Sequence, residues 1–277
     1  SQELFVSQPA ITKHIQELEA AYQTRLFDRQ GSRISLTESG NLLLEHCERI
    51  LEDYKRLEYE MHLLHNEYTG GLKLGASTTI AQYVLPPLLA SFIGKFPQVS
   101  LSLLNGNSRE IEAALQEHRI DLGFVEGVFR LPNIRYTTFL EDELVAVVRT
   151  GSKLAVGEEI TPDELFHLPL VLRERGSGTL DVFERALQQH NIKLSSLQVL
   201  MYLGSTESIK LFLEHTDCLG IVSVRSITRE LYSGQLRVVE IKGMPMLRDF
   251  SFAQPQGQES GLAQVFMQFA MHNNHKL

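Results

Sequence analysis

The stretch that decides the fold of the first part of the chain is VSQPAITKHIQELE, Val6 to Glu19. Ser7 is a good N-cap, and Pro9 falls in the first turn, where its missing N–H costs nothing. We therefore predict a helix from about Gln8 to Tyr22. Apolar residues recur at helical spacing and form the stripe that we expect to be buried: Ile11, Ile15, Leu18 and Tyr22.

The opposite side of this predicted helix is short-chained and polar, with Pro9, Thr12, Lys13 and Gln16. Gln and Thr side chains can hydrogen-bond base edges in a DNA major groove, whereas Lys13 and Ser7 suit phosphate contacts. A helix face that simply meets solvent would look the same, so this pattern alone leaves both interpretations open.

A second motif follows in TRLFDRQGSRISLTESG, residues 24–40. Arg29 and Arg33 flank a Gly31-Ser32 turn between two short apolar runs, which is typical of a β-hairpin, here a wing with a basic tip. Taken together, VSQPAITKHIQELE, RLFDR and LTESG resemble the winged helix-turn-helix of the LysR-type transcriptional regulators.

This resemblance implies that the first helix enters the major groove of double-stranded DNA and that the wing lies on the DNA backbone. The implied DNA-binding residues are Ser7, Gln8, Pro9, Thr12, Lys13, Gln16, Arg29 and Arg33. Compared with the family, the first helix and most of the second helix of the module are missing. We therefore expect an N-terminally incomplete winged helix-turn-helix over residues 1–37.

Behind the wing, Thr37 is a candidate N-cap, and no Pro or Gly interrupts the chain between Gly40 and Gly70. Apolar residues here alternate at four and three spacing, which predicts a coiled-coil seam: Leu43, Cys47, Ile50, Tyr54, Leu57, Met61, Leu64 and Tyr68. A helix packed on its own domain is the alternative, although it usually has a wider stripe. We expect a linker helix over 38–69 that dimerises the chain, and the resemblance adds assembly to a tetramer.

From Gly71 the pattern alternates between strands and helices, which favours an α/β domain over 70–277. The two series of elements predict two lobes, lobe one at about 72–147 and 249–277 and lobe two at about 148–248. Strands crossing between the lobes are expected near Leu144–Gly151 and Met246–Phe252, with a terminal helix from about Gly261 to His272. The family resemblance implies two Rossmann-like lobes similar to type 2 periplasmic binding proteins.

Hydroxyl-bearing residues gather at three strand-to-helix junctions of this domain, where helix N-termini can hold a small anion. Each junction alone is explained by an ordinary helix cap. With the matching segments LRERGSGT, GNS and GSTESIK, the resemblance implies an effector site formed by Ser77, Thr79, Asn107, Arg173, Ser177, Thr179 and Thr206. Many relatives carry Arg where Leu180 stands, so the effector is expected to be less charged or to be held differently.

Composition narrows the possible functions further. A formal net charge of -8 means that any DNA contact must come from a local surface. Two distant cysteines provide neither a disulfide framework nor a zinc site, and a reducing cytoplasm is the expected compartment. No catalytic motif appears, and we interpret the acidic run Glu141–Glu143 as a solvated loop, so we expect no enzyme, no cofactor and no metal. A transporter's solute-binding protein would explain the two lobes, but it would have no use for residues 1–68.

Overall fold

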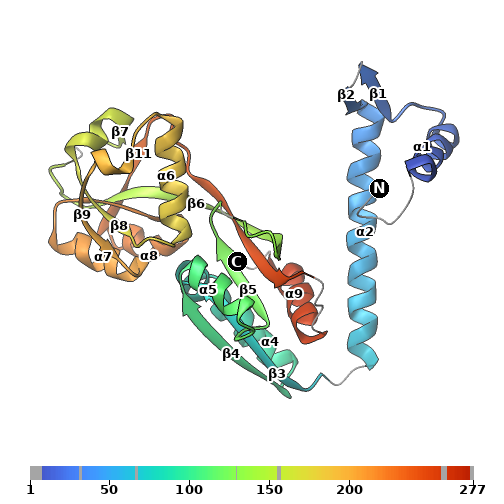
Figure 1. Ribbon diagram of the computed structural model, residues 1–277. Coiled ribbons are helices and arrows are strands. Elements are labelled where there is room, and N and C mark those ends of the chain that lie inside the picture. The colour runs from blue at the N-terminus through green and yellow to red at the C-terminus, as the bar shows by residue number, and fades with distance from the viewer. Residues whose placement is uncertain are drawn as a thin grey trace. The chain divides into compact units, whose positions relative to one another are not determined.

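The structure, a computed structural model, describes residues 8–30, 33–65, 68–128, 130–154, 157–256 and 261–274. Two compact units divide the chain, Ser1–Asn66 and Glu67–Leu277 (Figure 1). Each unit is described by itself below. Ser7 and the Gly31-Ser32 turn lie outside the described residues.

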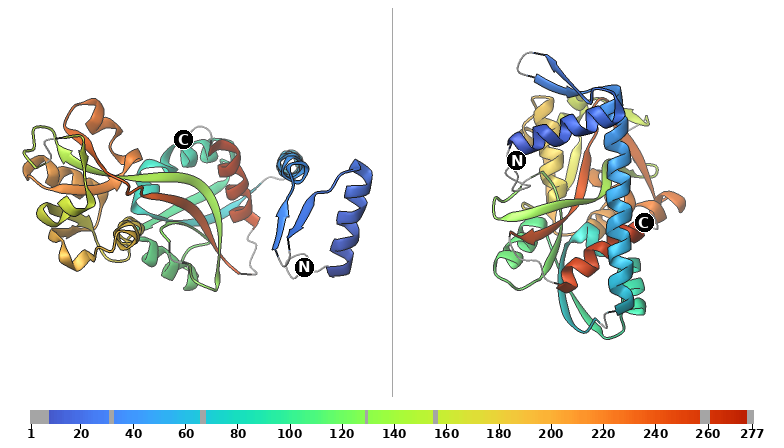
Figure 2. Two further views of the ribbon diagram at one scale, coloured as in Figure 1. Left: turned by 90° about the horizontal axis from the view of Figure 1, so that it is seen from above. Right: turned by 90° about the vertical axis from the view of Figure 1, so that its right-hand side faces the viewer.

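The first unit contains the predicted helix and the predicted hairpin. Helix α1 covers Gln8–Tyr22, and strands β1 (Phe27–Gln30) and β2 (Arg33–Leu36) pair antiparallel, with Gln30 opposite Arg33. Seen along the long helix that follows, the hairpin lies between that helix and α1 (Figure 2). Both element predictions are confirmed.

The apolar stripe of α1 differs from expectation, because no residue of this helix is buried. Ile11 and Ile15 are half-buried, while Leu18 and Tyr22 are exposed to 38% and 60%. An amphipathic helix buries its stripe only where another element packs on it. The described elements of this unit cover Ile11 and Ile15 only in part and leave Leu18 and Tyr22 exposed. The prediction that this stripe is buried is therefore wrong for the described residues.

Helix α2 spans Glu38–His65, and Thr37 caps it as predicted, since Thr37 Oγ1 accepts a hydrogen bond of 3.0 Å from the Gly40 N–H. A side chain at Gly40 would place its Cβ 2.1 Å from the carbonyl oxygen of Leu26, so this position tolerates only glycine. The helix ends before Tyr68, whose ring packs edge-on against Phe96 in the second unit. Tyr68 is therefore not a seam residue, which corrects the prediction.

The second unit is built on one ten-stranded mixed sheet in the order β4-β3-β5-β12-β6-β10-β8-β9, with β11 pairing β6 and β7. Its strands are β3 (Gly70–Ser77), β4 (Val99–Gly106), β5 (Leu122–Glu126), β6 (Ile134–Arg149), β7 (Glu159–Ile160), β8 (Pro169–Arg173), β9 (Gln198–Leu203), β10 (Leu219–Ser223), β11 (Leu236–Ile241) and β12 (Leu247–Pro255). The helices are α3 (Thr78–Tyr83), α4 (Leu85–Lys95), α5 (Ser108–Gln116), α6 (Gly178–Gln189), α7 (Thr206–His215), α8 (Thr228–Tyr232) and α9 (Gly261–Asn273), with short 3-10 turns η1 (Pro162–His167), η2 (Leu194–Ser196) and η3 (Val224–Ser226).

Pairing within the sheet separates two groups of strands. Strands β3, β4 and β5 pair in parallel, as do β8, β9 and β10, which is the arrangement expected of alternating strands and helices. Strand β6 connects the groups: residues 134–143 pair with β12, whereas residues 144–149 pair with β10 or β11. The change of partner begins where the crossing at Leu144–Gly151 was expected.

Each group has its own apolar core. Ile111, Leu115 and Ala253 belong to a cluster under α5, while Phe183, Leu187 and other residues of α6 fill a larger cluster with β8, β10 and β11. The segment that follows β3 forms two helices, α3 and α4, with Pro86 and Pro87 at the start of α4. Among the described residues, no helix is long and apolar enough to cross a membrane.

Candidate DNA-reading helix and candidate effector site

The polar side of α1 is open to solvent. Gln8, Pro9, Thr12, Lys13 and Gln16 are all exposed. Thr12 Oγ1 donates to the carbonyl oxygen of Gln8 in its own helix, at 3.0 Å. The amide of Gln16 and the ammonium of Lys13 thus stand on one exposed helix surface, which gives it one group for base edges and one for phosphates.

Lys13 has a neighbour of opposite charge, with its Nζ 3.8 Å from Glu17 Oε1. The two side chains are 76% and 59% exposed, and an exposed pair of this kind contributes little to stability. The contact therefore costs little to exchange for a phosphate. On the wing, Arg29 is opposite Ile34 and Arg33 is opposite Gln30, so both arginines lie near the tip of the hairpin.

In the second unit, the residues expected to bind an effector lie at strand ends and helix starts, and all except the half-buried Asn107 are buried: Ser77, Thr79, Arg173, Ser177, Thr179 and Thr206. Asn107 and Ser177 cap α5 and α6, because their side chains accept hydrogen bonds from the backbone N–H groups of Glu110 and Thr179. The side chains of Asn107 and Ser177, which the sequence predicted to bind a ligand, therefore already use one acceptor each to cap a helix.

Arg173 joins elements of both strand groups. Its guanidinium is 1% exposed and lies 2.9 Å from the carboxylate of Glu174. It also donates to Thr206 Oγ1 at 3.4 Å and to Thr78 Oγ1 at 3.3 Å, and so links the starts of α7 and α3. Arg175, the other arginine of the segment LRERGSGT, is exposed.

Three further residues complete a buried polar group that the sequence analysis did not assign to a site: Glu126, Asp142 and Arg248. The Arg248 side chain is 0% exposed, and its Nη1 lies 3.1 Å from Glu126 Oε1 while its Nη2 lies 2.7 Å from Asp142 Oδ2. It also donates to Thr179 Oγ1 at 3.0 Å. Glu126 is the last residue of β5, and Arg248 lies near the start of β12, within the crossing predicted at Met246–Phe252. These positions at strand ends were the signal by which the sequence could have indicated site residues.

Glu126 is the acceptor on which the predicted hydroxyls converge. Its Oε1 accepts hydrogen bonds from Thr79 Oγ1 and Thr179 Oγ1, both at 3.4 Å. We call Glu126, Asp142, Arg248, Thr79 and Thr179 the interlobe polar cluster. It brings together two of the predicted effector residues, Thr79 and Thr179, around a carboxylate that the chain itself supplies.

Asp142 corrects the interpretation of Glu141–Glu143 as a solvated loop. These residues belong to strand β6, and Asp142 is 5% exposed. Burial of its carboxylate is tolerated because Arg248 forms an ion pair with it and Ser223 Oγ donates to it at 2.7 Å.

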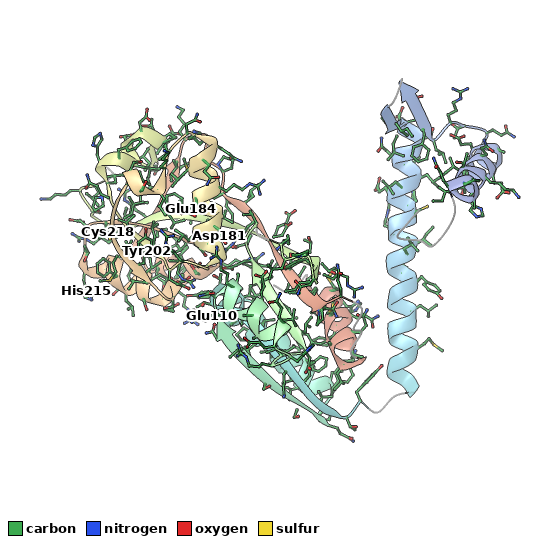
Figure 3. All side chains as sticks on the ribbon, in the orientation of Figure 1. Glu110, Asp181, Glu184, Tyr202, His215 and Cys218 are labelled. Carbon is green, nitrogen blue, oxygen red and sulfur yellow. The ribbon has the colours of Figure 1, made fainter. Side chains whose placement is uncertain are left out.

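Glycines let the two strand groups approach closely beside the cluster. A Cβ at Gly178 would lie 2.3 Å from the carbonyl oxygen of Glu126, and the Arg109 N–H donates to the carbonyl of Gly176 at 3.4 Å. Glu110 and Asp181, labelled in Figure 3, lie in the first turns of α5 and α6. Burial raises the pKa of Asp181, and the nearby Arg109 opposes that rise.

A hollow of about 690 Å³ lies between Tyr83 of α3, Glu207 and Lys210 of α7 and Glu230 of α8. Tyr83 donates a hydrogen bond to Glu207, and burial together with this carboxylate raises the Tyr83 pKa. Lys210 is buried and bonded to the carboxylates of Glu207 and Glu230. None of the predicted effector residues lines this hollow.

Metal binding has no support in the parts of the chain that the structure describes, since no group of three or more His, Cys, Asp or Glu side chains there is arranged to hold an ion. The geometry instead defines an exposed polar helix followed by a wing, and a two-lobed domain whose helix starts meet at buried polar side chains. This combination is the architecture of a ligand-responsive DNA-binding regulator.

Comparisons with known proteins agree with that class. Residues 65–274 match the family model of the LysR substrate binding domain, and residues 1–41 match the bacterial regulatory helix-turn-helix protein, lysR family. The chain belongs to the LysR family. It is a LysR-type transcriptional regulator with an effector-binding domain, and this family consists of regulators rather than enzymes.

Individual relatives support the same assignment. The chain is 34% identical over 238 residues to the uncharacterized HTH-type transcriptional regulator YeiE of Escherichia coli (strain K12), covering 86% of this chain and 78% of YeiE. It is 31% identical over 269 residues to a probable RuBisCO transcriptional regulator of Gracilaria tenuistipitata var. liui, covering 95% and 86%. The regulatory domain of Synechocystis PCC6803 CcmR, solved in complex with 2-PG, matches with a TM-score of 0.67 and 28% identity over 74% of this chain and 97% of that domain.

Proposed function

We propose that this regulator binds a palindromic double-stranded operator as a dimer, through α1 in the major groove and the wing on the backbone. The proposed contacts are Ser7, Gln8, Pro9, Thr12, Lys13, Gln16, Arg29 and Arg33. The observation that carries this proposal is the exposed polar side of α1, which presents Gln16 and Lys13 without a buried partner for either among the described residues. A cytoplasmic location follows from the proposed DNA partner.

We further propose the domain limits 1–37, 38–69 and 70–277, with dimerisation through α2. The exposed apolar side chains along α2 support this proposal: Ile50, Tyr54, Leu57 and Met61 are 48–66% exposed in the single chain. Such a stripe is covered when a second copy packs on it. Strands β4 and β9 end the sheet of the second unit and expose Leu103, Leu104, Leu200, Met201 and Tyr202. These two edges support a second self-contact and hence a tetramer.

The effector that we propose is a small anion held between the two lobes, near Ser77, Thr79, Asn107, Arg173, Ser177, Thr179 and Thr206. The bound 2-PG of the CcmR regulatory domain supports a small-molecule site in the equivalent domain. Binding would close or twist the lobes, change how dimers pair and so alter the bend imposed on DNA.

A mobility-shift titration of the full chain on its own upstream region tests DNA binding. Gln16→Ala should cost about 1–3 kcal/mol on the preferred sequence and reduce discrimination between sequences, because an amide contact to a base edge is lost. Lys13→Ala should instead weaken binding to all sequences and lower the salt dependence by about one phosphate contact. Binding that is insensitive to salt and sequence in the unaltered protein would refute the proposal.

A further inference from the structure

Within the described residues, two buried oxygen atoms at the interlobe polar cluster lack a hydrogen-bond partner: one belongs to the cluster, and the other belongs to a residue two positions before Thr79 of that cluster. Glu126 Oε2 and Ser77 Oγ are fully buried and form no hydrogen bond with any described residue, although the other oxygen of Glu126 is bonded to Thr79, Thr179 and Arg248. Buried polar atoms in folded proteins nearly always have a partner. These two atoms without a hydrogen-bond partner therefore indicate which chemical groups a ligand bound there would carry.

The two atoms differ in what they can receive. An ionised carboxylate oxygen only accepts hydrogen bonds, so the missing partner of Glu126 Oε2 is a donor. A serine hydroxyl both donates and accepts, so Ser77 can donate to an oxygen of the same ligand. Both residues belong to strand ends of one strand group, β5 and β3, which pair with each other in the sheet.

Charges around the cluster limit the ligand further. Arg248 already faces two carboxylates, Glu126 and Asp142. Arg225 Nε lies 3.6 Å from Asp142 Oδ1, and Arg173 lies against Glu174. Each of these three arginines, Arg248 in the cluster and Arg225 and Arg173 beside it, thus already faces at least one carboxylate. A fully ionised anion bound there would be repelled by the Glu126 carboxylate. Among these three arginines it would find no unpaired cation, and it would have no proton with which to form a hydrogen bond to Glu126.

From these observations we infer that Glu126 is a specificity-determining residue that accepts a hydrogen bond from the effector. The effector class is a small anion that also carries a hydrogen-bond donor, such as a hydroxy acid or an oxyanion that retains one proton. Glu126 excludes the fully ionised counterpart by charge repulsion. This inference rests on the proposed effector function of the two lobes.

Matched pairs of anions test the inference on the full chain by calorimetry at about pH 7 and constant ionic strength. Inorganic phosphate retains a proton at this pH, whereas sulfate, of similar size and shape, does not. Glycolate has a hydroxyl that acetate lacks. We expect the protonated or hydroxylated member of each pair to bind at least about tenfold more tightly, which is the value of one hydrogen bond to a charged group.

Glu126→Gln keeps the size of the side chain but supplies a donor as well as an acceptor, so the preference should fall below about threefold. Glu112→Gln is the matched control, because Glu112 is buried in the same unit but hydrogen-bonded to Tyr136 outside the cluster. That variant should keep the full preference. Glu126→Asp retains the charge and should still disfavour sulfate.

Equal or tighter binding of sulfate and acetate by the unaltered protein overturns the inference, and so does the absence of binding by all four anions. A preference that survives in Glu126→Gln overturns it as well. If Glu126→Gln does not fold, the inference is tested by the preference of the unaltered protein and of Glu126→Asp for phosphate over sulfate and for glycolate over acetate. A sequence-selective mobility shift that persists while the anion test fails shows that only the inference is wrong, whereas loss of both refutes the proposed regulator function too.

Discussion

At the scale of single residues, Arg248 holds together β12, β6 and the start of α6. Its guanidinium contacts Asp142 at 2.7 Å, Glu126 at 3.1 Å and the hydroxyl of Thr179 at 3.0 Å. A buried cation of this kind is tolerated because its partners compensate the loss of water. Burial of the Glu126 and Asp142 carboxylates likewise depends on the positive charge of Arg248.

Replacing Arg248 by Met should therefore lower the free energy of unfolding by about 3–5 kcal/mol, since Glu126 and Asp142 would remain buried without their ion pair. Urea denaturation of the full chain measures this change. Arg119→Met is the control: Arg119 is 53% exposed and forms a surface ion pair with Glu117, so its loss should cost less than about 1 kcal/mol. A loss below about 1 kcal/mol at Arg248 would contradict the prediction.

Glu112 gives a pH-dependent prediction. Burial raises the pKa of Glu112 above its usual value of 4.5, although the hydrogen bond from Tyr136 Oη, at 2.5 Å, opposes the rise. The same contact and burial raise the pKa of Tyr136 to about 12. Because the folded pKa of Glu112 exceeds the unfolded one, this residue contributes stability that is present below the unfolded pKa and is lost as the pH rises through the folded pKa.

The difference in the free energy of unfolding between the unaltered protein and Glu112→Gln should thus be larger at about pH 4 than at about pH 7. Glu164 is the opposite case, because hydrogen bonds from Thr161 lower its pKa and its contribution is lost as the pH falls. Glu164→Gln should therefore show the reverse trend. If the difference in the free energy of unfolding changed with pH in the same direction for both variants, the shifted pKa values would not explain it.

At the scale of elements, α2 combines a polar helix with an exposed apolar seam. Leu57 is 54% exposed in the single chain and lies midway between Tyr54 and Met61. Most of a helix's stability in a protein comes from packing of its apolar face, so we expect a second copy to cover the seam.

Leu57→Lys should convert the dimer to monomer at micromolar concentration, because a charge in each copy would face its counterpart across the seam. Sedimentation velocity measures the change, and DNA affinity should fall with it since both reading helices are needed for a palindrome. Glu45→Lys, on the outer side of α2 and 66% exposed, is the control and should stay dimeric. A dimeric Leu57→Lys would locate the self-contact elsewhere.

At the scale of the whole effector-binding unit, the two strand groups touch through backbone at Gly178. The carbonyl oxygen of Glu126 would lie 2.3 Å from an added Cβ, and backbone atoms cannot yield as a flexible side chain can. Closure of the lobes therefore depends on the absence of a side chain at this position.

Gly178→Ala should separate the strand groups, weaken anion binding at least about tenfold and enlarge the radius of gyration measured by X-ray scattering, because loss of the close approach removes part of the site. DNA binding without effector should persist. Gly94→Ala, at an open position of α4, should leave scattering unchanged and stabilise the fold by about 0.5–1 kcal/mol. Unchanged anion affinity in Gly178→Ala would show that the approach is not needed for binding.

The sequence by itself determined the order and type of most elements, although Glu141–Glu143, expected to be a loop, belong to strand β6. Helical spacing predicted α1, the Thr37 cap predicted the start of α2, the turn residues predicted the hairpin, and alternating patterns predicted strands of the sheet. These features are local, since they depend on residues a few positions apart. Where a prediction needed a partner for an element, as for the stripe of α1 or for Tyr68, the sequence failed.

Tertiary structure alone decided the chemistry between the lobes. Glu126, Asp142 and Arg248 are far apart in the chain, and each looks like an ordinary surface charge when only its neighbours in sequence are considered. The sheet brings their strands together, as β12 pairs with both β5 and β6, and burial then makes each charge depend on the others. The desolvation that couples them is a property of the folded interior, so no local pattern of residues could specify it.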